Sequence, residues 1–323
     1  MLNVALLGIG NIGLLFDDDK DDRSKALSHI KAIYLHKNLT LKYVVDIDNS
    51  KISKVKEFFP NVVFYNNYNK LLKCKDIDIL SIATPTNTHY TILKAFQDNI
   101  YIKLFFIEKP LFQHIQEYNN IKMKNKIVVN YLRRFDKNIQ KLKSKISQNK
   151  FGKVQKIIIN YCKGIKNNGS HMIDMINFLF DNPKVISSNI LSSTNGFNID
   201  DMTYDIFVQI KYNNQIIPVY FLGLDHTLYN IIEQNIYFEN KIIKYINSKS
   251  QIEYFDIVPD KNFSQYNVSQ HIPKIKKVNT KMLMKYAYNT IYKIITKNYK
   301  NNSNFKSELA NTKFLNKLLK GKK

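Results

Sequence analysis

A glycine motif near the start of the chain most strongly constrains how it can fold. Residues 2–7 form a short apolar run that predicts a buried strand, and a G-x-G-x-x-G motif follows at once, Gly8-Ile9-Gly10-Asn11-Ile12-Gly13. Gly8 allows the tight turn out of the strand, Gly10 lets a pyrophosphate approach the backbone, and Gly13 lets the next helix pack closely on the strand. The free N–H groups and positive end of that helix would then bind the pyrophosphate. The motif therefore predicts a dinucleotide site.

A second predicted strand, at residues 41–46, ends in Asp46. A carboxylate at that strand end accepts hydrogen bonds from the ribose hydroxyls of the dinucleotide, and it repels a 2′-phosphate. Asp46 therefore predicts NAD as the cofactor in preference to NADP.

The first hundred residues alternate between strand and helix patterns. Strands are predicted at about 2–7, 41–46, 61–65, 77–83 and 101–108, with helical patterns between them at 52–59 and 90–97. This alternation predicts a doubly wound parallel sheet of the Rossmann type, in a dinucleotide-binding domain over residues 1–124.

The pattern changes at about residue 150. Long alternating runs at 154–161, 204–212, 216–224 and 231–255 predict an open, mostly antiparallel sheet, and two amphipathic helices follow near 280–297 and 305–320. We expect residues 125–323 to form an α+β domain that serves substrate binding and oligomerisation. Because an open sheet usually needs a covered face, a homodimer or homotetramer is expected.

The net charge of +23 would ordinarily suggest a nucleic-acid or membrane partner. Only three arginines occur, however, so almost all of the positive charge is lysine scattered along the chain. Arginine is the residue that bidentate phosphate and base recognition favours. We therefore expect no specific nucleic-acid partner, with polyanion binding kept as an alternative role. No apolar run approaches the ~18 residues of a transmembrane helix.

Cysteine and acidic residues add little chemistry. Cys74 and Cys162 offer neither a disulfide framework nor metal-ligand spacing, and they fit a cytoplasmic protein. The apolar start lacks the basic region of a signal peptide. An acidic cluster in the first crossover is expected to point into solvent, and no metal site is predicted there; its members are Asp17, Asp18, Asp19, Asp21 and Asp22.

Three later motifs resemble those of the Gfo/Idh/MocA family, which includes glucose–fructose oxidoreductase and inositol dehydrogenase. They are Ala83-Thr84-Pro85-Thr86-Asn87-Thr88-His89, Glu108-Lys109-Pro110, and Asn167-Asn168-Gly169-Ser170-His171-Met172-Ile173-Asp174. Their order and spacing carry the resemblance over nearly the whole chain. The resemblance implies an NAD-dependent oxidoreductase whose cofactor is held by Gly8, Gly10, Asn11, Ile12, Gly13, Asp46, Thr84, Pro85, Asn87, His89, Glu108 and Lys109.

The resemblance also implies the catalytic residues. Lys109, at the carboxyl end of a strand, would hold the reacting hydroxyl and favour a developing alkoxide, and the peptide bond before Pro110 is often cis in the family. His171 would accept the hydroxyl proton, because imidazole titrates near neutral pH. Asn167 stands where many members carry an aspartate; it can bind substrate but cannot relay a proton. Asp174, one turn further, either orients His171 or caps a neighbouring element.

Two of the three arginines, Arg133 and Arg134, stand together after Tyr131. The resemblance implies that they lie on a strand that faces the substrate cleft. A permanently charged, two-pronged donor there suits a carboxylate or phosphate of the substrate, or else an ion pair with a neighbouring acid. The expected substrate site consists of Lys109, Tyr131, Arg133, Arg134, Asn167 and His171.

We expect an NAD-dependent dehydrogenase that oxidises a secondary hydroxyl of a sugar. The expected substrate is a nucleotide sugar or related polyol of surface-glycan biosynthesis. Reduction of a keto-sugar or imine is one alternative, and a catalytically idle NAD-binding sensor or scaffold is another.

Overall fold

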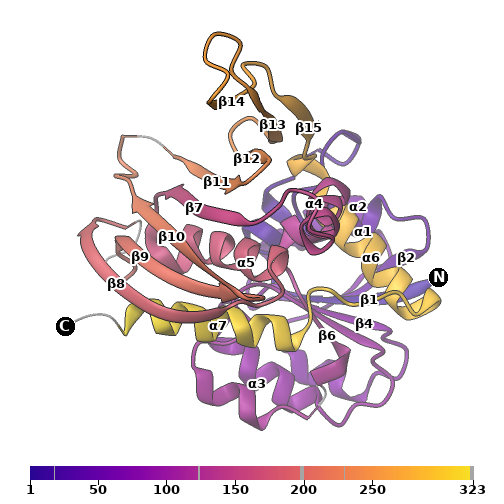
Figure 1. Cartoon of the computed structure of the whole chain (residues 1–323). Coiled ribbons are helices and arrows are strands. Elements are labelled where there is room, and N and C mark those ends of the chain that lie inside the picture. The colour runs from indigo at the N-terminus through magenta and orange to yellow at the C-terminus, as the bar shows by residue number, and fades with distance from the viewer. Residues whose placement is uncertain (18, 123, 197–199, 229, 321–323) are drawn as a thin grey trace. The chain divides into compact units, whose positions relative to one another are not determined.

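The computed structural model divides into two compact units (Figure 1), and it describes residues 1–17, 19–122, 124–196, 200–228 and 230–320. The first unit contains residues 1–136 and 279–309, and the second contains residues 137–278 and 310–323. The predicted domains are each continuous in the sequence, whereas each compact unit is assembled from two segments.

The first unit is built on a six-stranded parallel sheet in the order β3-β2-β1-β4-β5-β6. Every neighbouring pair runs parallel. The strands are β1 Leu2–Leu7, β2 Leu39–Val45, β3 Val63–Tyr65, β4 Ile79–Ile82, β5 Leu104–Ile107 and β6 Ile127–Val129. The central strands read as continuous apolar runs because both faces of the sheet are buried. This strand order is that of a Rossmann fold.

Helices cover both faces of this sheet. On one face, α1 His29–Tyr34, α2 Ile52–Phe58 and α6 Leu283–Lys297 share a core with side chains such as Leu6 and Phe106. On the other face, α3 Thr86–Phe96 packs against side chains such as Leu7 and Phe105. Alternate strand residues thus enter different cores, as the two-residue period of a strand requires.

The second unit contains a nine-stranded sheet in the order β14-β13-β12-β11-β7-β10-β9-β8, with β15 also paired to β13. Among the described residues of this sheet, only β7 and β10 pair in parallel, and the other pairs are antiparallel. The strands are β7 Val154–Tyr161, β8 Lys184–Thr194, β9 Thr203–Tyr212, β10 Gln215–Gly223, β11 Ile232–Phe238, β12 Lys241–Ile246, β13 Gln251–Pro259, β14 Asn267–Ser269 and β15 Lys274–Lys277.

One face of this sheet packs against helices, as Figure 1 shows for α5 beside β8–β10. The core is shared with α4 Lys137–Ser147, α5 Ser170–Leu179 and the second half of α7 Phe305–Leu319. In β10, Ile217, Val219 and Phe221 enter this core, whereas Ile216 and Leu222 lie on the other face and are exposed.

The predicted fold class is therefore confirmed: a doubly wound parallel sheet and a second, mostly antiparallel sheet with helices. The largest difference in element bounds lies in the run predicted at 231–255, which is three separate strands, β11, β12 and β13. Among the residues described, no helix combines the length and apolar composition needed to cross a bilayer.

Candidate functional site

The glycine motif adopts the close geometry that its sequence predicts. Gly8 has φ +92°, and a Cβ there would lie 2.7 Å from the backbone of Ala83. A Cβ on Gly13 would collide with the carbonyl oxygen of Gly8, whereas a Cβ on Gly10 would meet nothing within 4 Å. Gly8 and Gly13 are thus required by the backbone itself, and the open space at Gly10 leaves room for a pyrophosphate.

The helix expected after this motif is one short turn. Asn11–Leu15 form a five-residue π-helix, and the chain then crosses to α1, which begins only at His29. The helix dipole predicted to bind the pyrophosphate is therefore weaker than expected, because a strong macrodipole needs many aligned peptide groups. The first N–H groups of even a single turn still lack intrahelical acceptors and can face an anion.

Asp46 follows β2 and lies beside the glycine loop. Its Oδ2 accepts a hydrogen bond from the Ile9 amide at 2.7 Å, and its Oδ1 accepts from the Asp48 amide at 2.9 Å. The carboxylate is therefore held at the strand end by two backbone donors, in the position from which it would meet a ribose.

A cavity of about 750 Å³ opens at this edge of the sheet. That volume lies in the range of small-molecule and cofactor sites. Its lining comes from the glycine loop, the end of β2 and the turn before α3, and includes Gly8, Gly10, Asp46, Thr84 and Pro85.

The turn into α3 is held by its own side chains. Thr84 and Thr88 hydroxyls lie 2.7 Å apart, and Asn87 lies in the first turn of the helix. His89 is fully buried, with its ring nitrogens 2.9 Å from the Thr84 carbonyl and 3.1 Å from the Leu111 carbonyl. Burial lowers the pKa of His89, so the ring is neutral at pH 7 and can donate through one nitrogen only. The contacts of His89 with backbone carbonyls therefore stabilise the turn that carries Thr84.

Glu108 and Lys109 directly follow β5, where the Glu108 amide still bonds the Ile82 carbonyl at 2.9 Å. The Lys109–Pro110 peptide bond is cis, as the family resemblance implies. The ends of β1, β2, β4 and β5 thus bring the glycine loop, Asp46, Thr84 and Glu108-Lys109 to one edge of the sheet, where open α/β sheets bind ligands.

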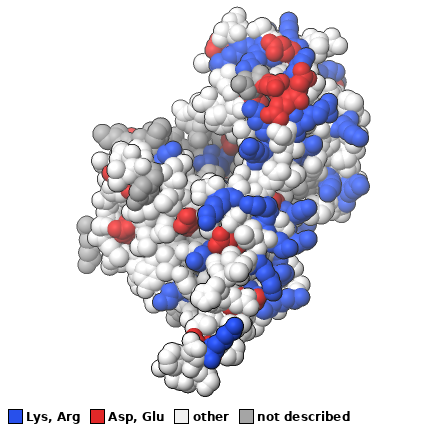
Figure 2. Space-filling model, turned by 90° about the horizontal axis from the view of Figure 1, so that it is seen from above, with Lys and Arg blue, Asp and Glu red and all other residues white. Residues whose placement is uncertain are grey.

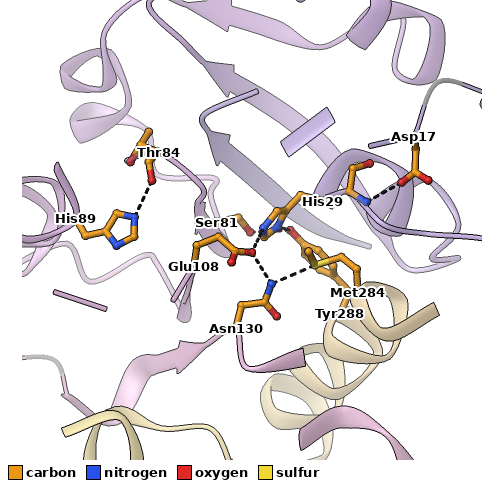
Figure 3. Close-up of polar contacts among 10 residues, drawn as sticks. Asp17, His29, Ser81, Thr84, His89, Glu108, Asn130, Met284 and Tyr288 are labelled. Carbon is orange, nitrogen blue, oxygen red and sulfur yellow. Dashed lines mark hydrogen bonds and ion pairs between the residues drawn. The ribbon is translucent and has the colours of Figure 1, made fainter. Parts of the chain in front are cut away.

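Sequence reasoning missed a buried hydrogen-bonded chain behind Glu108 (Figure 3). Glu108 Oε1 accepts from His29 Nε2 at 2.9 Å and from Asn130 Nδ2 at 2.5 Å. His29 Nδ1 lies 2.8 Å from the Tyr288 hydroxyl, which lies 2.9 Å from Ser81 Oγ. The contributing residues come from five separate segments, so no local spacing could reveal the chain.

The arginine pair divides into two environments. Both residues lie in the 3₁₀ turn Leu132–Phe135 after β6, not in a strand as expected. Arg134 is buried and donates to the Asn302 carbonyl at 2.7 Å, and it lies over the buried Tyr131 ring. Arg133 is only partly buried. Arg134 thus has a structural contact, and Arg133 is the better candidate for a substrate anion.

In the second unit, the predicted Asn167 and His171 lie on consecutive helical turns. Asn167 belongs to the π-helical turn Gly164–Gly169, and His171 is the second residue of α5; both are partly buried. Gly169 packs closely on the turn before it, because a Cβ there would lie 2.6 Å from Cδ1 of Ile165. The buried Asp174 accepts from Asn311 of α7 at 2.7 Å.

Asp201 anchors the turn that carries Asn167, and sequence reasoning did not identify it. Its Oδ1 accepts from the Lys166 amide and its Oδ2 from the Asn167 amide, both at 2.8 Å. Gly164, with φ +87°, passes so close to this carboxylate that a Cβ would collide with it. Two charge-assisted bonds to consecutive amides therefore set the backbone of the turn.

The expectation that the acidic cluster points into solvent is wrong for Asp17. That side chain is fully buried, and its Oδ2 accepts from the Leu27 and Ser28 amides at 2.8 and 2.6 Å, since it closes the loop before α1. Asp19 and Asp21 are exposed, Asp22 is partly exposed, and Asp18 lies outside the described residues. Within the described ranges, no three His, Cys, Asp or Glu side chains gather closely enough to hold a metal ion.

Comparison with known proteins agrees with this geometry. Residues 2–126, which include the glycine motif, Asp46 and Glu108-Lys109, match the family model described as an oxidoreductase family with an NAD-binding Rossmann fold. The matched model is that of the Gfo/Idh/MocA oxidoreductases, and the match covers the dinucleotide-binding part of the chain. The cofactor of the chain is accordingly NAD, and the resemblance inferred from the sequence motifs is confirmed. No curated protein sequence matches the chain.

Solved structures share the fold over almost the whole length. A myo-inositol dehydrogenase from Corynebacterium glutamicum is 17% identical, with 99% of this chain and 96% of that one covered and a TM-score of 0.72. A dehydrogenase (MviM) from Clostridium difficile is 15% identical over 99% of both chains, with a TM-score of 0.70. A super-repressor mutant of Gal80p from Saccharomyces cerevisiae is 12% identical over 99% and 96%, with a TM-score of 0.73.

We predict that Asp201→Asn destabilises the turn carrying Asn167. An amide can accept from only one of the two backbone N–H groups, so one buried donor loses its partner, which costs about 1–3 kcal/mol. Hydrogen exchange of the Lys166 and Asn167 amides should accelerate accordingly. Asp200→Asn, which alters the exposed neighbouring carboxylate, is the matched control. Unchanged exchange in Asp201→Asn would contradict the anchoring role.

Proposed function

We propose that this oxidoreductase is an NAD-dependent dehydrogenase that oxidises a secondary hydroxyl of a sugar, either a nucleotide sugar or a related polyol of surface-glycan biosynthesis. The observation that carries the proposal is the single sheet edge where the glycine loop, Asp46 and Glu108-Lys109 meet. That arrangement supplies a cavity for the dinucleotide and places a lysine at the end of β5, at the same edge of the sheet. The Gly-x-His-x-x-Asp motif of the second unit adds a proton acceptor.

The chemistry divides between the cofactor and the side chains. NAD, when bound, supplies the hydride acceptor. Lys109 donates a hydrogen bond to the reacting oxygen and stabilises negative charge that develops there. His171 takes the hydroxyl proton as the carbon loses its hydride. Asn167 binds the substrate, because its amide cannot relay a proton.

The same residues allow the reverse reaction, reduction of a keto-sugar or imine, with His171 as the proton donor. A different class of function is a catalytically idle NAD-binding sensor or scaffold. The likeness to a Gal80p super-repressor mutant shows that this fold also occurs in a repressor protein. Retention of both Lys109 and His171 favours an enzyme, since a sensor needs neither.

Dispersed positive charge supports a small-molecule substrate. In the view of Figure 2, Lys and Arg side chains form separate groups, with acidic and uncharged surface between them.

We also propose a cytoplasmic homodimer or homotetramer. Ile216 (58% exposed) and Leu222 (37% exposed) lie on the face of β10 opposite its core side chains, and such apolar side chains favour coverage by a second copy.

We predict that NAD binds at least about tenfold more tightly than NADP, because the Asp46 carboxylate repels a 2′-phosphate. Asp46→Ser keeps a short acceptor and removes the charge, so it should narrow the difference. Isothermal titration calorimetry with both cofactors measures it. Asp98→Ser, a change at an exposed carboxylate of the same unit, should leave the ratio unchanged. Equal or tighter NADP binding by the unaltered protein would sink the assignment.

We predict that Lys109→Ala and His171→Ala each reduce turnover by ~10²–10⁴-fold, the usual range for general acid–base groups, while NAD affinity stays nearly constant. A panel of nucleotide sugars and polyols, followed by absorbance of the reduced cofactor, identifies the substrate for this measurement. Lys276→Ala and His271→Ala change exposed residues of the same types and serve as controls. His171→Ala with half of the normal rate would require another proton acceptor.

We predict that Arg133 recognises a negative charge of the substrate. Arg133→Lys keeps the charge but loses the two-pronged geometry, and Arg133→Ala loses both. Both variants should raise KM for a charged substrate more than for its neutral analogue, with the larger effect in Arg133→Ala. Equal losses for the two compounds would instead favour a neutral sugar or inositol as the substrate.

A further inference from the structure

The buried chain behind Glu108 begins on β4 and ends at the cofactor edge of the sheet. It runs from Ser81 through Tyr288 and His29 to Glu108, with separations of 2.9, 2.8 and 2.9 Å (Figure 3). Ser81, Tyr288 and His29 are fully buried, and Glu108 keeps 15% of its side chain exposed. The chain therefore has one closed end in the interior and one end that can meet a ligand.

The positions of the protons along this hydrogen-bonded chain follow from which of its groups can donate and which can only accept. Burial raises the pKa of Tyr288 far above its usual value, so its hydroxyl stays protonated and can donate to Nδ1 of His29. Nε2 of His29 must then carry the proton that lies between it and Glu108 Oε1, since a carboxylate accepts only. Ser81 can donate to the Tyr288 oxygen. Every donor in this arrangement faces an acceptor, with His29 as the Nε2–H tautomer.

Packing holds the His29 ring in this orientation. The ring centroid lies 5.3 Å from that of Phe106 and 5.7 Å from that of Tyr288, and Phe106 and Tyr288 lie 5.2 Å apart. A second donor to Glu108 is Asn130, the residue after β6, whose Nδ2 lies 2.5 Å from Glu108 Oε1 and 3.4 Å from Met284 Sδ. Side chains locked by packing hold a functional group accurately.

Both donors bind the same oxygen of Glu108. Oε1 is thereby hydrogen-bonded to two interior side chains, whereas Oε2 accepts no hydrogen bond from the residues that the structure describes. Asn130 Oδ1 is also buried and unpartnered among these residues. Oε2 is therefore the oxygen of Glu108 that is left for a ligand, in a partly exposed side chain that directly precedes Lys109 at the end of β5.

We propose that His29 is a positioning residue: with Tyr288 behind it, His29 orients the Glu108 carboxylate so that Oε2 binds the nicotinamide-ribose half of NAD. The adenosine half lies with the glycine loop and Asp46 instead. This role depends on the NAD site and not on the sugar substrate, so it can fail or hold separately from the proposed reaction.

Binding of two probes tests the proposal. NADH contains both halves of the cofactor, whereas ADP contains only the half bound by the glycine loop. His29→Leu should weaken NADH binding by about tenfold or more, the loss expected for a hydrogen bond to a charged group, and should leave ADP binding unchanged. His29→Gln can still donate to Glu108 and should recover much of the NADH affinity. Glu108→Gln should resemble His29→Leu.

A double-mutant cycle separates positioning from general stability. If His29 acts through Glu108, the His29→Leu/Glu108→Gln protein should bind NADH no more weakly than either single variant. Equal weakening of NADH and ADP by His29→Leu, or additive losses in the double variant, would overturn the proposal. Far-UV circular dichroism of each variant confirms that the fold is retained.

A measurement on the unaltered protein covers the case in which His29→Leu does not fold. Nitrogen-15 NMR of labelled histidine reports which ring nitrogens carry protons. The proposal expects a proton on Nε2 of His29, and Tyr288→Phe should shift its Nδ1 signal. An unprotonated Nε2 in the unaltered protein would overturn the proposal.

Discussion

The first unit depends on how closely backbone meets backbone at the end of β1. Gly8 turns there with φ +92° against the Ala83 backbone, and Gly13 returns over the Gly8 carbonyl. No side chain fits at either position, so the ends of β1 and β4 and the first crossover can approach only because both residues are glycine. The opening for the cofactor beside Gly10 is a consequence of this approach.

Carboxylates stabilise loops within each of the two units. Asp46, Asp17 and Asp201 each accept hydrogen bonds from two backbone amides. Charge-assisted bonds of this kind are stronger than neutral ones, and each fixes a turn that has no regular ladder to hold it. The chain has only 26 acidic residues against 49 basic ones, and three of these acids stabilise turns. Net charge alone therefore does not show what the individual charged residues do.

The carboxyl ends of the parallel strands bring the candidate site residues of the first unit together. Strand ends bring together Asp46, Thr84 and Glu108-Lys109, while the crossover and α6 bring His29 and Tyr288 behind Glu108. A carboxylate held from behind keeps one oxygen for the ligand without a cost in side-chain freedom when the ligand arrives.

The sequence by itself determined the alternation of strands and helices, the glycine turn, the acid after β2 and the three family motifs, because these depend on local spacing and on residue chemistry. It also predicted the cis peptide bond through the family resemblance. Tertiary structure alone decided the burial of Asp17, the division of roles between Arg133 and Arg134, and the anchoring by Asp201. It also decided the hydrogen-bonded chain from Ser81 to Glu108, in which the directly bonded His29 and Tyr288 are 259 residues apart along the sequence. Contacts between distant segments leave no periodic pattern, so only the folded backbone shows which polar groups meet.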